Sequence, residues 1–282
     1  MCRHLAYLGP PVSLARLVLT PSHGLYEQSW APRRQTYGVV NADGFGIGWY
    51  PVAGGDGAYP EVGEAVVVEP ARYRRAVPIW TDPNLPDMAH AIRSHAVLAA
   101  VRSATAGTTQ DEAAAAPFRD GRFLFSHNGA IPEWTDLPAD LADLDVPSES
   151  DRLEPADLLR LEARSDTALL WLLIRRALRR GVPPDEALAD VVHRVAEVRP
   201  TARLNLLLTD GKTIFATRYG DTLAYRTDPG SVLVASEPDD EDPKSWRELP
   251  DRTLLLATEA GVVRTTTLQA PDVAAAGSEA SP

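Results

Sequence analysis

The chain has 282 residues, of which 44% are hydrophobic and 24% are charged, and its formal net charge at pH 7 is −11. Such a chain can bury a full core, and its acidic balance argues against nucleic-acid binding, which depends on neutralising phosphates. No run approaches the roughly 20 apolar residues of a membrane span, and a single cysteine excludes an internal disulfide framework. We therefore expect a cytoplasmic enzyme without a nucleic-acid or membrane partner.

Short apolar runs bounded by turn residues dominate the first half of the chain and predict strands. They lie at 2–9, at 38–50 (two strands around an Asn/Asp/Gly turn), and at 65–68, 97–102 and 122–126. Short helices are expected at 14–17 and at 70–76, where a proline stands at the first helical position. The glycines at 44, 46 and 48 lack the spacing of a dinucleotide-binding loop, so we expect another backbone to pack closely against them.

The clearest helical pattern covers 165–180, with Ser165 as N-cap, Asp166 in the first turn and Gly181 as terminator. A second helix is expected at 185–198. Strands follow at 203–209, 213–219, 222–226, 232–236 and 253–258. Strands, two central helices and strands again indicate one layered α+β domain rather than alternating βαβ units.

Two segments have the composition of additions to this domain. Residues 136–162 are rich in Asp, Glu and Pro and are expected to form an exposed insertion. Residues 271–282 consist of small residues, two acids and prolines and are expected to be a disordered tail, which leaves a domain over 2–270. Two arginine clusters, at 72–75 and 175–180, are interpreted as solvated faces.

Cys2 is the only cysteine, and it directly follows the initiator methionine. Methionine is normally removed before a small residue, so the mature chain would begin with a thiol and a free α-amine on one residue. An α-amine titrates at about 7.7–8.0 and a thiol at about 8.5, so the amine can act as general base for its own side chain. The alternative is a small buried apolar residue, which is the usual role of a free cysteine.

Three further motifs each have a chemical and a structural interpretation. His127-Asn128-Gly129 ends an apolar strand; it is either a common turn or a pair of neutral donors, amide and backbone N–H, for an oxyanion. Arg102 precedes a polar turn that contains Thr105, and it is either a surface arginine or a bidentate fork directed into a cleft. Asp166 is a first-turn helix acid, or a ligand-binding carboxylate. His90 and His95 share no face cleanly, so we expect no metal.

In their order along the chain, these motifs resemble those of the class II glutamine amidotransferases, which are N-terminal-nucleophile hydrolases. The resemblance runs from Cys2 to about Thr265 and implies a four-layer αββα sandwich without a cofactor. It implies Cys2 as the nucleophile with its α-amine as base, and Asn128 with Gly129 as the oxyanion hole. It also implies that Arg102 holds the α-carboxylate of a γ-glutamyl group, that Thr105 lines the same turn, and that Asp166 binds the α-ammonium group.

Within this family the chain more closely resembles the ergothioneine-pathway amidohydrolases of actinobacteria. The shared segments are 1–5 (Met-Cys-Arg-His-Leu), 31–35 (Ala-Pro-Arg-Arg-Gln), 41–44, 93–95, 98–105 and 202–205. The resemblance implies a small-molecule γ-glutamyl substrate, γ-glutamyl-hercynylcysteine S-oxide, from which glutamate is removed. The trimethylammonium group of such a substrate favours aromatic faces, so Trp30, Tyr37, Trp49 and Trp80 are either core residues or a cage beside Cys2.

Two other functions and the oligomeric state stay open at this point. One is a glutaminase subunit that supplies ammonia to a separate synthase, because no residues remain here for a fused synthase domain. The other is an inactive module that binds γ-glutamyl compounds, which would have lost Cys2, Arg102 or Asn128. A homo-oligomer is compatible with the sequence.

Overall fold

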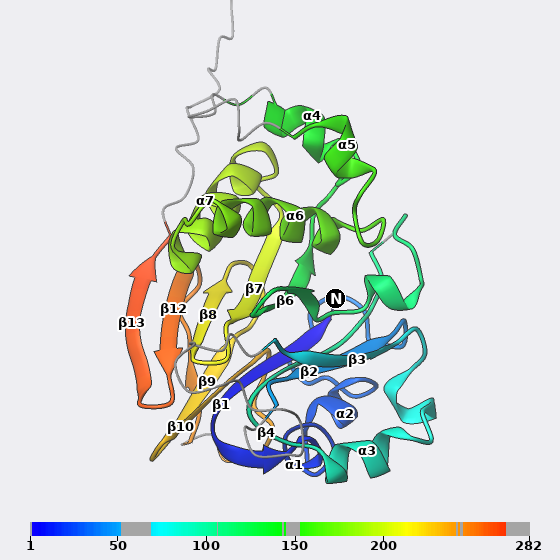
Figure 1. Ribbon diagram of the computed structural model, residues 1–282, viewed down its shortest axis with the longest axis vertical. Coiled ribbons are helices and arrows are strands. Elements are labelled where there is room, and N and C mark those ends of the chain that lie inside the picture. The colour runs from blue at the N-terminus through cyan, green and yellow to red at the C-terminus, as the bar shows by residue number, and fades with distance from the viewer. Residues whose placement is uncertain are drawn as a thin grey trace, which may run out of the picture.

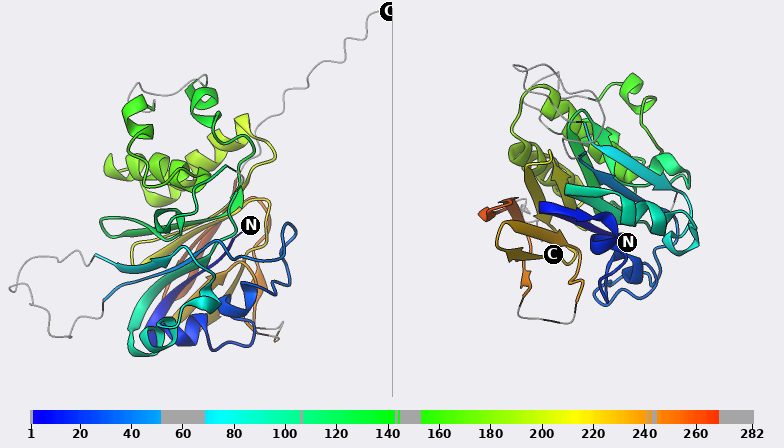
Figure 2. Two further views of the ribbon diagram at one scale, coloured as in Figure 1. Left: turned by 90° about the vertical axis from the view of Figure 1, so that its right-hand side faces the viewer. Right: turned by 60° about the horizontal axis from the view of Figure 1, so that its bottom comes forward.

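The computed structural model describes residues 2–51, 69–105, 107–142, 144, 153–240, 242 and 245–268. They form four layers: two antiparallel sheets face each other, and helices cover the outer face of each sheet (Figure 1). The side view in Figure 2 shows the same stacking and places the marked N-terminus at the edge between the two sheets. The expected α+β class and four-layer αββα sandwich are confirmed.

The first sheet contains the start of the chain at its centre. Its strand order is β11-β9-β10-β1-β4-β2-β3, where the bounds are β1 (Arg3–Ser13), β2 (Phe45–Trp49), β3 (Ala71–Arg75), β4 (Arg93–Val101), β9 (Ala224–Asp228), β10 (Ser231–Ala235) and β11 (Arg247–Glu248). The register pairs Arg3 with Val101 and Leu5 with Ala235. Cys2 therefore lies beside the end of β4, and the residues that follow β10 lie beside Arg3.

The second sheet has the order β13-β12-β8-β7-β6-β5. Its bounds are β5 (Phe118–Asp120), β6 (Phe123–Ala130), β7 (Arg203–Thr209), β8 (Thr213–Arg218), β12 (Thr253–Thr258) and β13 (Gly261–Thr267). Asn128 and Gly129 belong to β6 and pair with Asn205 and Leu204 of β7. The proposed oxyanion pair thus stands in a strand of the sheet, where β7 pairs with it on one side, while β5 pairs only with the earlier residues Phe123–Phe125 of β6.

Three hydrophobic clusters separate the four layers. Side chains of α1 (Leu14–Val18), α2 (Leu25–Gln28) and α3 (Leu85–Ala91) pack on the first sheet, and those of α6 (Asp166–Arg179) and α7 (Pro184–Val198) pack on the second. The third cluster fills the space between the sheets. Helix α6 begins as predicted, because the Ser165 side chain accepts from the Ala168 N–H.

The predicted helix at 70–76 is wrong, because this segment is strand β3 at the edge of the first sheet. Pairing with β2 outweighs the weak signal of a proline start. Two of the three arginines of β3 are also not a solvated face, whereas the Arg75 side chain is 41% exposed and pairs with the exposed Glu112. Arg72 and Arg74 both pair with Glu162 at 2.8 Å, and that carboxylate explains why they are partly buried.

The predicted pair of strands at 38–50 is half right, because only β2 forms and residues 38–44 are irregular. Their polar groups bind elsewhere: the Asn41 amide donates to Gln28 and Gln35. The close backbone approach expected at the glycines is confirmed, since a Cβ at Gly46 would stand 2.2 Å from the Ala116 oxygen. The predicted strand at 65–68 lies outside the described residues.

Part of the segment predicted to be an exposed insertion belongs to the core. It contains α4 (Leu137–Ala142) and α5 (Pro155–Leu158), and Leu137 and Leu141 are buried against the α6–α7 layer. Their spacing of four residues is a one-turn apolar stripe, too short to stand out in an acidic segment.

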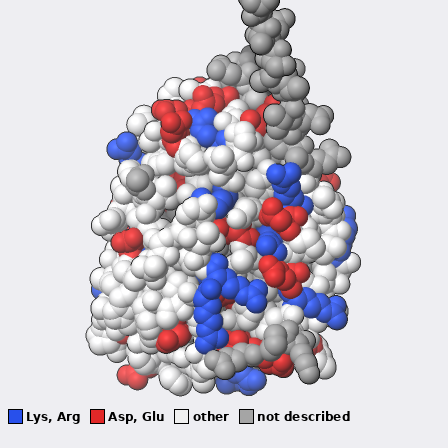
Figure 3. Space-filling view, turned by 180° about the vertical axis from the view of Figure 1, so that it is seen from behind, with Lys and Arg blue, Asp and Glu red and all other residues white. Residues whose placement is uncertain are grey.

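The rear face in Figure 3 shows basic and acidic side chains intermixed. Among the described residues, no helix combines the length and apolar character needed to cross a membrane.

Candidate active site

Cys2 is under the electrostatic influence of a cation, Arg102, and an anion, Asp166, that come from different parts of the chain. Its thiol is 3.8 Å from the backbone oxygen of Ser103 and is partly buried. The pKa of the thiol is raised, because burial and, to a smaller extent, Asp166 outweigh the positive charges of the amino terminus and of Arg102, which lower it. Both candidate binding residues therefore act electrostatically on the same sulfur.

Arg102 is a buried residue that directly follows β4, so its interpretation as a surface arginine is wrong. Backbone hydrogen bonds with Asp43 and Gly44 fix its position. The guanidinium donates to the Thr108 hydroxyl and the Thr109 carbonyl, both at 2.8 Å, and to the Asp43 carbonyl at 3.5 Å. All three acceptors are neutral oxygens, so its positive charge stays available for an anionic ligand.

Asp166 does more than stabilise the start of α6. It is 3% exposed, and its Oδ2 accepts from the Thr105 hydroxyl at 3.2 Å and from the Ile131 N–H at 3.4 Å. Its Oδ1 accepts from the Thr167 N–H at 2.8 Å. The carboxylate thereby joins the turn after Arg102 to the residue that follows β6. Thr105 was expected to line the turn beside Arg102, but its hydroxyl contacts Asp166.

Asn128 and Gly129 are not a turn. A Cβ at Gly129 would stand 1.9 Å from the Arg203 carbonyl oxygen, so this position accepts only glycine. The Asn128 side chain is fully buried, with Nδ2 3.3 Å from the Ser236 hydroxyl and Oδ1 without a hydrogen-bond partner. The pair is rigidly held and carries an unsatisfied polar atom in the interior.

One small cavity brings Cys2 and Arg102 together, whereas Thr105, Asn128, Gly129 and Asp166 do not line it. The other residues that line it are Ala100, Val101, Ala114, Ala116, His127 and Thr167, of which the last two stand next to Asn128 and Asp166 in the sequence. Thr105 and Ile131 line a different, larger cavity. Among the residues that the structure describes, no group of three His, Cys, Asp or Glu side chains could hold a metal ion.

None of the four aromatic residues considered for a cage lines the cavity beside Cys2. Trp30, Tyr37 and Trp80 are not core residues either, because 37%, 55% and 37% of their surfaces are exposed. Trp30 and Trp80 meet edge to face at 5.6 Å, and the Tyr37 ring packs on the Arg203 guanidinium at 4.3 Å. The cage hypothesis therefore fails at this cavity.

Sequence reasoning missed two residues that shape the site. Asp43 looked like part of a hairpin turn, but its carboxylate accepts from the Ala104 N–H at 2.8 Å and fixes the turn after Arg102. Ser236 carried no signal, since it ends an ordinary apolar strand. Its hydroxyl accepts from the His4 N–H at 3.0 Å and contacts Asn128.

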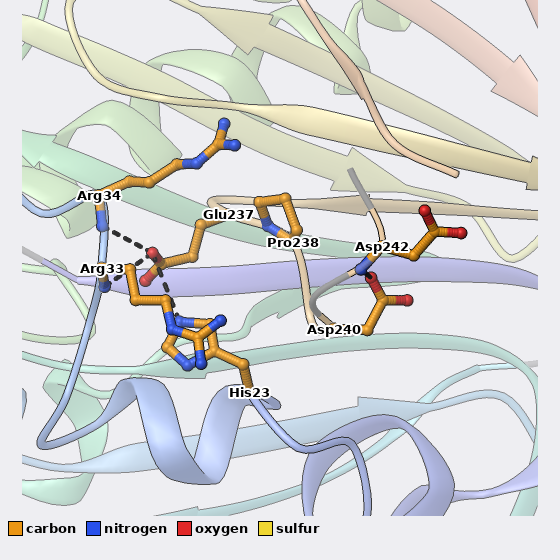
Figure 4. A pocket seen from close by; sticks show the side chains of 7 residues that line it. All are labelled: His23, Arg33, Arg34, Glu237, Pro238, Asp240 and Asp242. Atoms are coloured by element: carbon orange, nitrogen blue, oxygen red, sulfur yellow. Dashed lines mark hydrogen bonds and ion pairs between the residues drawn. The ribbon is translucent and has the colours of Figure 1, made fainter. Parts of the chain in front are cut away.

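A separate pocket lies on the other side of Arg3, around Glu237. His23, Arg33, Arg34, Pro238, Asp240 and Asp242 line it with Glu237 (Figure 4). The close-up shows the Glu237 carboxylate turned toward the backbone nitrogens of Arg33 and Arg34 and toward the His23 ring. This arrangement fixes the segment that precedes Asn41.

Comparison with known proteins identifies a family and several relatives. The family described as "Glutamine amidotransferases class-II" matches residues 23–280. The chain is 40% identical over 265 residues to the gamma-glutamyl-hercynylcysteine sulfoxide hydrolase of Mycolicibacterium smegmatis, covering 94% of this chain and 99% of that protein. It is 39% identical over 265 residues to the protein of the same name from Mycobacterium tuberculosis, covering 94% and 96%.

A solved structure with a similar fold is a glutamine aminotransferase class-II domain protein from Silicibacter pomeroyi. The TM-score is 0.61 at 24% identity, with 95% of this chain and 100% of the other covered. At this identity the likeness concerns the fold alone, whereas the family match covers most of the chain. The chain belongs to the class II glutamine amidotransferase family.

Proposed function

We propose that this protein is an amidohydrolase that cleaves the γ-glutamyl amide of γ-glutamyl-hercynylcysteine S-oxide to glutamate and hercynylcysteine S-oxide. The observation that carries the proposal is that Cys2 and Arg102 line one cavity, while Thr105, in the turn after Arg102, donates a hydrogen bond to Asp166. A γ-glutamyl group presents a carboxylate and an ammonium on one carbon, at a fixed distance from the scissile amide. The named relatives supply the identity of the leaving group.

The reaction begins once removal of Met1 has exposed the α-amine of Cys2. The amine takes the thiol proton, and the sulfur attacks the γ-carbonyl carbon of the substrate, which becomes a tetrahedral oxyanion. Collapse of this intermediate breaks the C–N bond, and the protonated amine gives its proton to the leaving nitrogen. A glutamyl thioester remains on Cys2. Water activated by the same amine hydrolyses it to glutamate and restores the thiol.

The oxyanion is assigned to the side-chain amide of Asn128 and the N–H of Gly129. Because the Ser236 hydroxyl oxygen accepts from the His4 N–H, its own hydrogen is free to donate. If the Asn128 amide is turned by 180°, Oδ1 accepts from the Ser236 hydroxyl, and Nδ2 takes the place where Oδ1 had no hydrogen-bond partner. This orientation satisfies the buried oxygen and leaves one neutral donor for the oxyanion.

The glutamyl head group is assigned to the other half of the site. Arg102 binds its α-carboxylate, since the guanidinium is buried and hydrogen-bonded to neutral oxygens. Asp166 binds the α-ammonium group, with Thr105 holding the carboxylate in place. A matched cation and anion select a zwitterion and fix the distance of its amide from Cys2.

The decisive experiment incubates purified protein with γ-glutamyl-hercynylcysteine S-oxide and, separately, with glutamine, and follows glutamate release by mass spectrometry. The proposal predicts turnover of the first substrate, and Cys2→Ala should abolish it without unfolding the protein. Glutamate release from glutamine alone would instead indicate a glutaminase that supplies ammonia to a separate synthase.

A thiolate nucleophile must stay reduced, so we assign the enzyme to the cytoplasm.

A further inference from the structure

Glu237 is a buried acid that the proposed reaction does not use. It is 1% exposed and follows β10 by two residues. The pairing of Leu5 with Ala235, continued by the hydrogen bond from Ser236 N–H to the His4 carbonyl, brings Glu237 beside Arg3. Arg3 is itself fully buried. A buried carboxylate thus lies next to a buried guanidinium, one residue away from Cys2.

The contacts of Glu237 hold down the segment before Asn41. Its Oε2 accepts from the backbone N–H groups of Arg33 and Arg34 at 2.9 and 2.7 Å, and the His23 Nε2 lies 3.6 Å away. Both backbone bonds end on one carboxylate oxygen, which Figure 4 shows facing the segment of Arg33 and Arg34. Charge-assisted bonds of this kind are stronger than neutral ones, so Glu237 anchors this segment.

The anchored segment in turn holds Arg3. Gln35, one residue after the second anchored N–H, accepts from the Arg3 Nε at 3.2 Å, and Asn41 donates to the same oxygen at 3.1 Å. On the other side, the Thr222 hydroxyl lies 3.5 Å from the Arg3 Nη1 and donates to the Ser236 carbonyl at 2.8 Å. The Arg3 side chain is therefore fixed between two separate parts of the chain.

We propose that Glu237 is a positioning residue for the catalytic terminus, acting through Gln35 and Arg3. The inference rests on the proposed function, in which Cys2 is the first residue of the mature chain. Such a residue has one covalent neighbour instead of two, so the direction of its amine and thiol depends on how firmly Arg3 is held. Burial of both charges makes this hold resistant to solvent.

Glu237→Gln tests the proposal. Its amide cannot accept both backbone N–H groups with the strength of a carboxylate, so the segment loosens and the terminus becomes mobile. We expect kcat to fall by about tenfold to 10²-fold, because small displacements of a nucleophile are costly, while KM changes less than about twofold. Glu237→Asp should recover part of the loss. Glu248→Gln is the matched control, because Glu248 is exposed and pairs with the Arg34 side chain.

A second variant and a second measurement cover the case in which Glu237→Gln fails to fold. Gln35→Ala removes the acceptor for Arg3 from a partly exposed position and should show the same loss of kcat with an unchanged melting temperature. Since the chain has one cysteine, the alkylation rate by iodoacetamide at pH 7 reports on Cys2 alone. It should rise in both variants, because the thiol leaves its partly buried position.

These outcomes separate the positioning role from the proposed function. Unaltered kcat and unaltered alkylation in folded Glu237→Gln and Gln35→Ala would overturn the positioning role, whatever the substrate is. A loss expressed in KM alone would also overturn it, since it would indicate a role in substrate binding. If the wild-type protein does not cleave the S-oxide substrate, the proposed function fails, and the alkylation measurement still decides the role of Glu237.

Discussion

Two buried arginines flank Cys2, and they differ in how their charge is compensated. Arg102 donates to a hydroxyl and two carbonyl oxygens. Arg3 also donates to neutral oxygens, those of Gln35 and Thr222, but the charges of Glu237 and Asp221 oppose the burial that lowers its pKa. Arg102 lines the cavity beside Cys2, where it is placed to bind an anion, whereas the charge of Arg3 is balanced inside the fold. Exposure alone does not distinguish them, since both are buried.

The largest expected effect concerns Arg102→Lys. Lysine keeps the charge but loses the planar fork that binds a carboxylate, and breaking a buried pair costs about 3–5 kcal/mol, or about 10²- to 10⁴-fold in rate. We expect kcat/KM for the γ-glutamyl substrate to fall by that factor, mainly through KM. Steady-state kinetics measure it, and a loss below about tenfold would remove Arg102 from head-group binding.

Asp166→Asn should have the next largest effect. The amide keeps the shape but loses the charge that faces the substrate ammonium group, and a hydrogen bond to a charged group contributes about 1.5–3 kcal/mol. We expect KM to rise by about 10- to 10²-fold. A glutaryl amide, which lacks the ammonium group, should be affected much less by the substitution. Equal losses for both substrates would contradict the assignment.

Arg3→Lys tests the other arginine and should leave substrate binding intact. Lysine retains a charge beside Glu237 but cannot contact Gln35 and Thr222 together. We expect kcat to fall by about tenfold, with KM for the substrate unchanged, and the melting temperature to decrease. If KM rises as in Arg102→Lys, the distinction between a binding and a positioning arginine is wrong.

The smallest expected effect concerns Glu237, which lies beside Arg3, and its contribution to the pH dependence of the free energy of unfolding. Burial alone raises the pKa of Glu237, but the nearby His23 and the charge of Arg3 outweigh it, so the net pKa is lowered. A lowered pKa contributes stability above the unfolded value of about 4.3, and this stability is lost as the pH falls through the folded pKa. Urea unfolding between pH 3 and 7 should therefore show a shallower acid loss in Glu237→Gln than in wild type.

The sequence predicted the layers and the candidate residues because those depend on local patterns and motif order. The α6 helix had its N-cap, its apolar face and its terminator within one window. The strand at 71–75 was missed, because its partner β2 is distant in sequence. The five residues show no clear strand pattern, and the proline before them favoured a helix. Pairing, not propensity, determines such an edge segment.

The parts of the site that could not be predicted are contacts between distant segments. Glu237 stands beside Arg3 only through the register of β10 on β1, and Ser236 reaches Asn128 only because the two sheets face each other. Neither residue carries a local signal. The aromatic cage failed for a related reason: abundance of aromatic residues in the first half of the chain does not determine which side chains reach the cavity.

The central claim is that Cys2, freed of Met1, carries the acyl group. Intact-protein mass spectrometry of enzyme quenched during turnover of γ-glutamyl-hercynylcysteine S-oxide tests it most directly. We predict a chain that begins at Cys2 and carries one glutamyl group on that residue, which Cys2→Ala eliminates. Active enzyme that retains Met1, or turnover by Cys2→Ala, would contradict the claim.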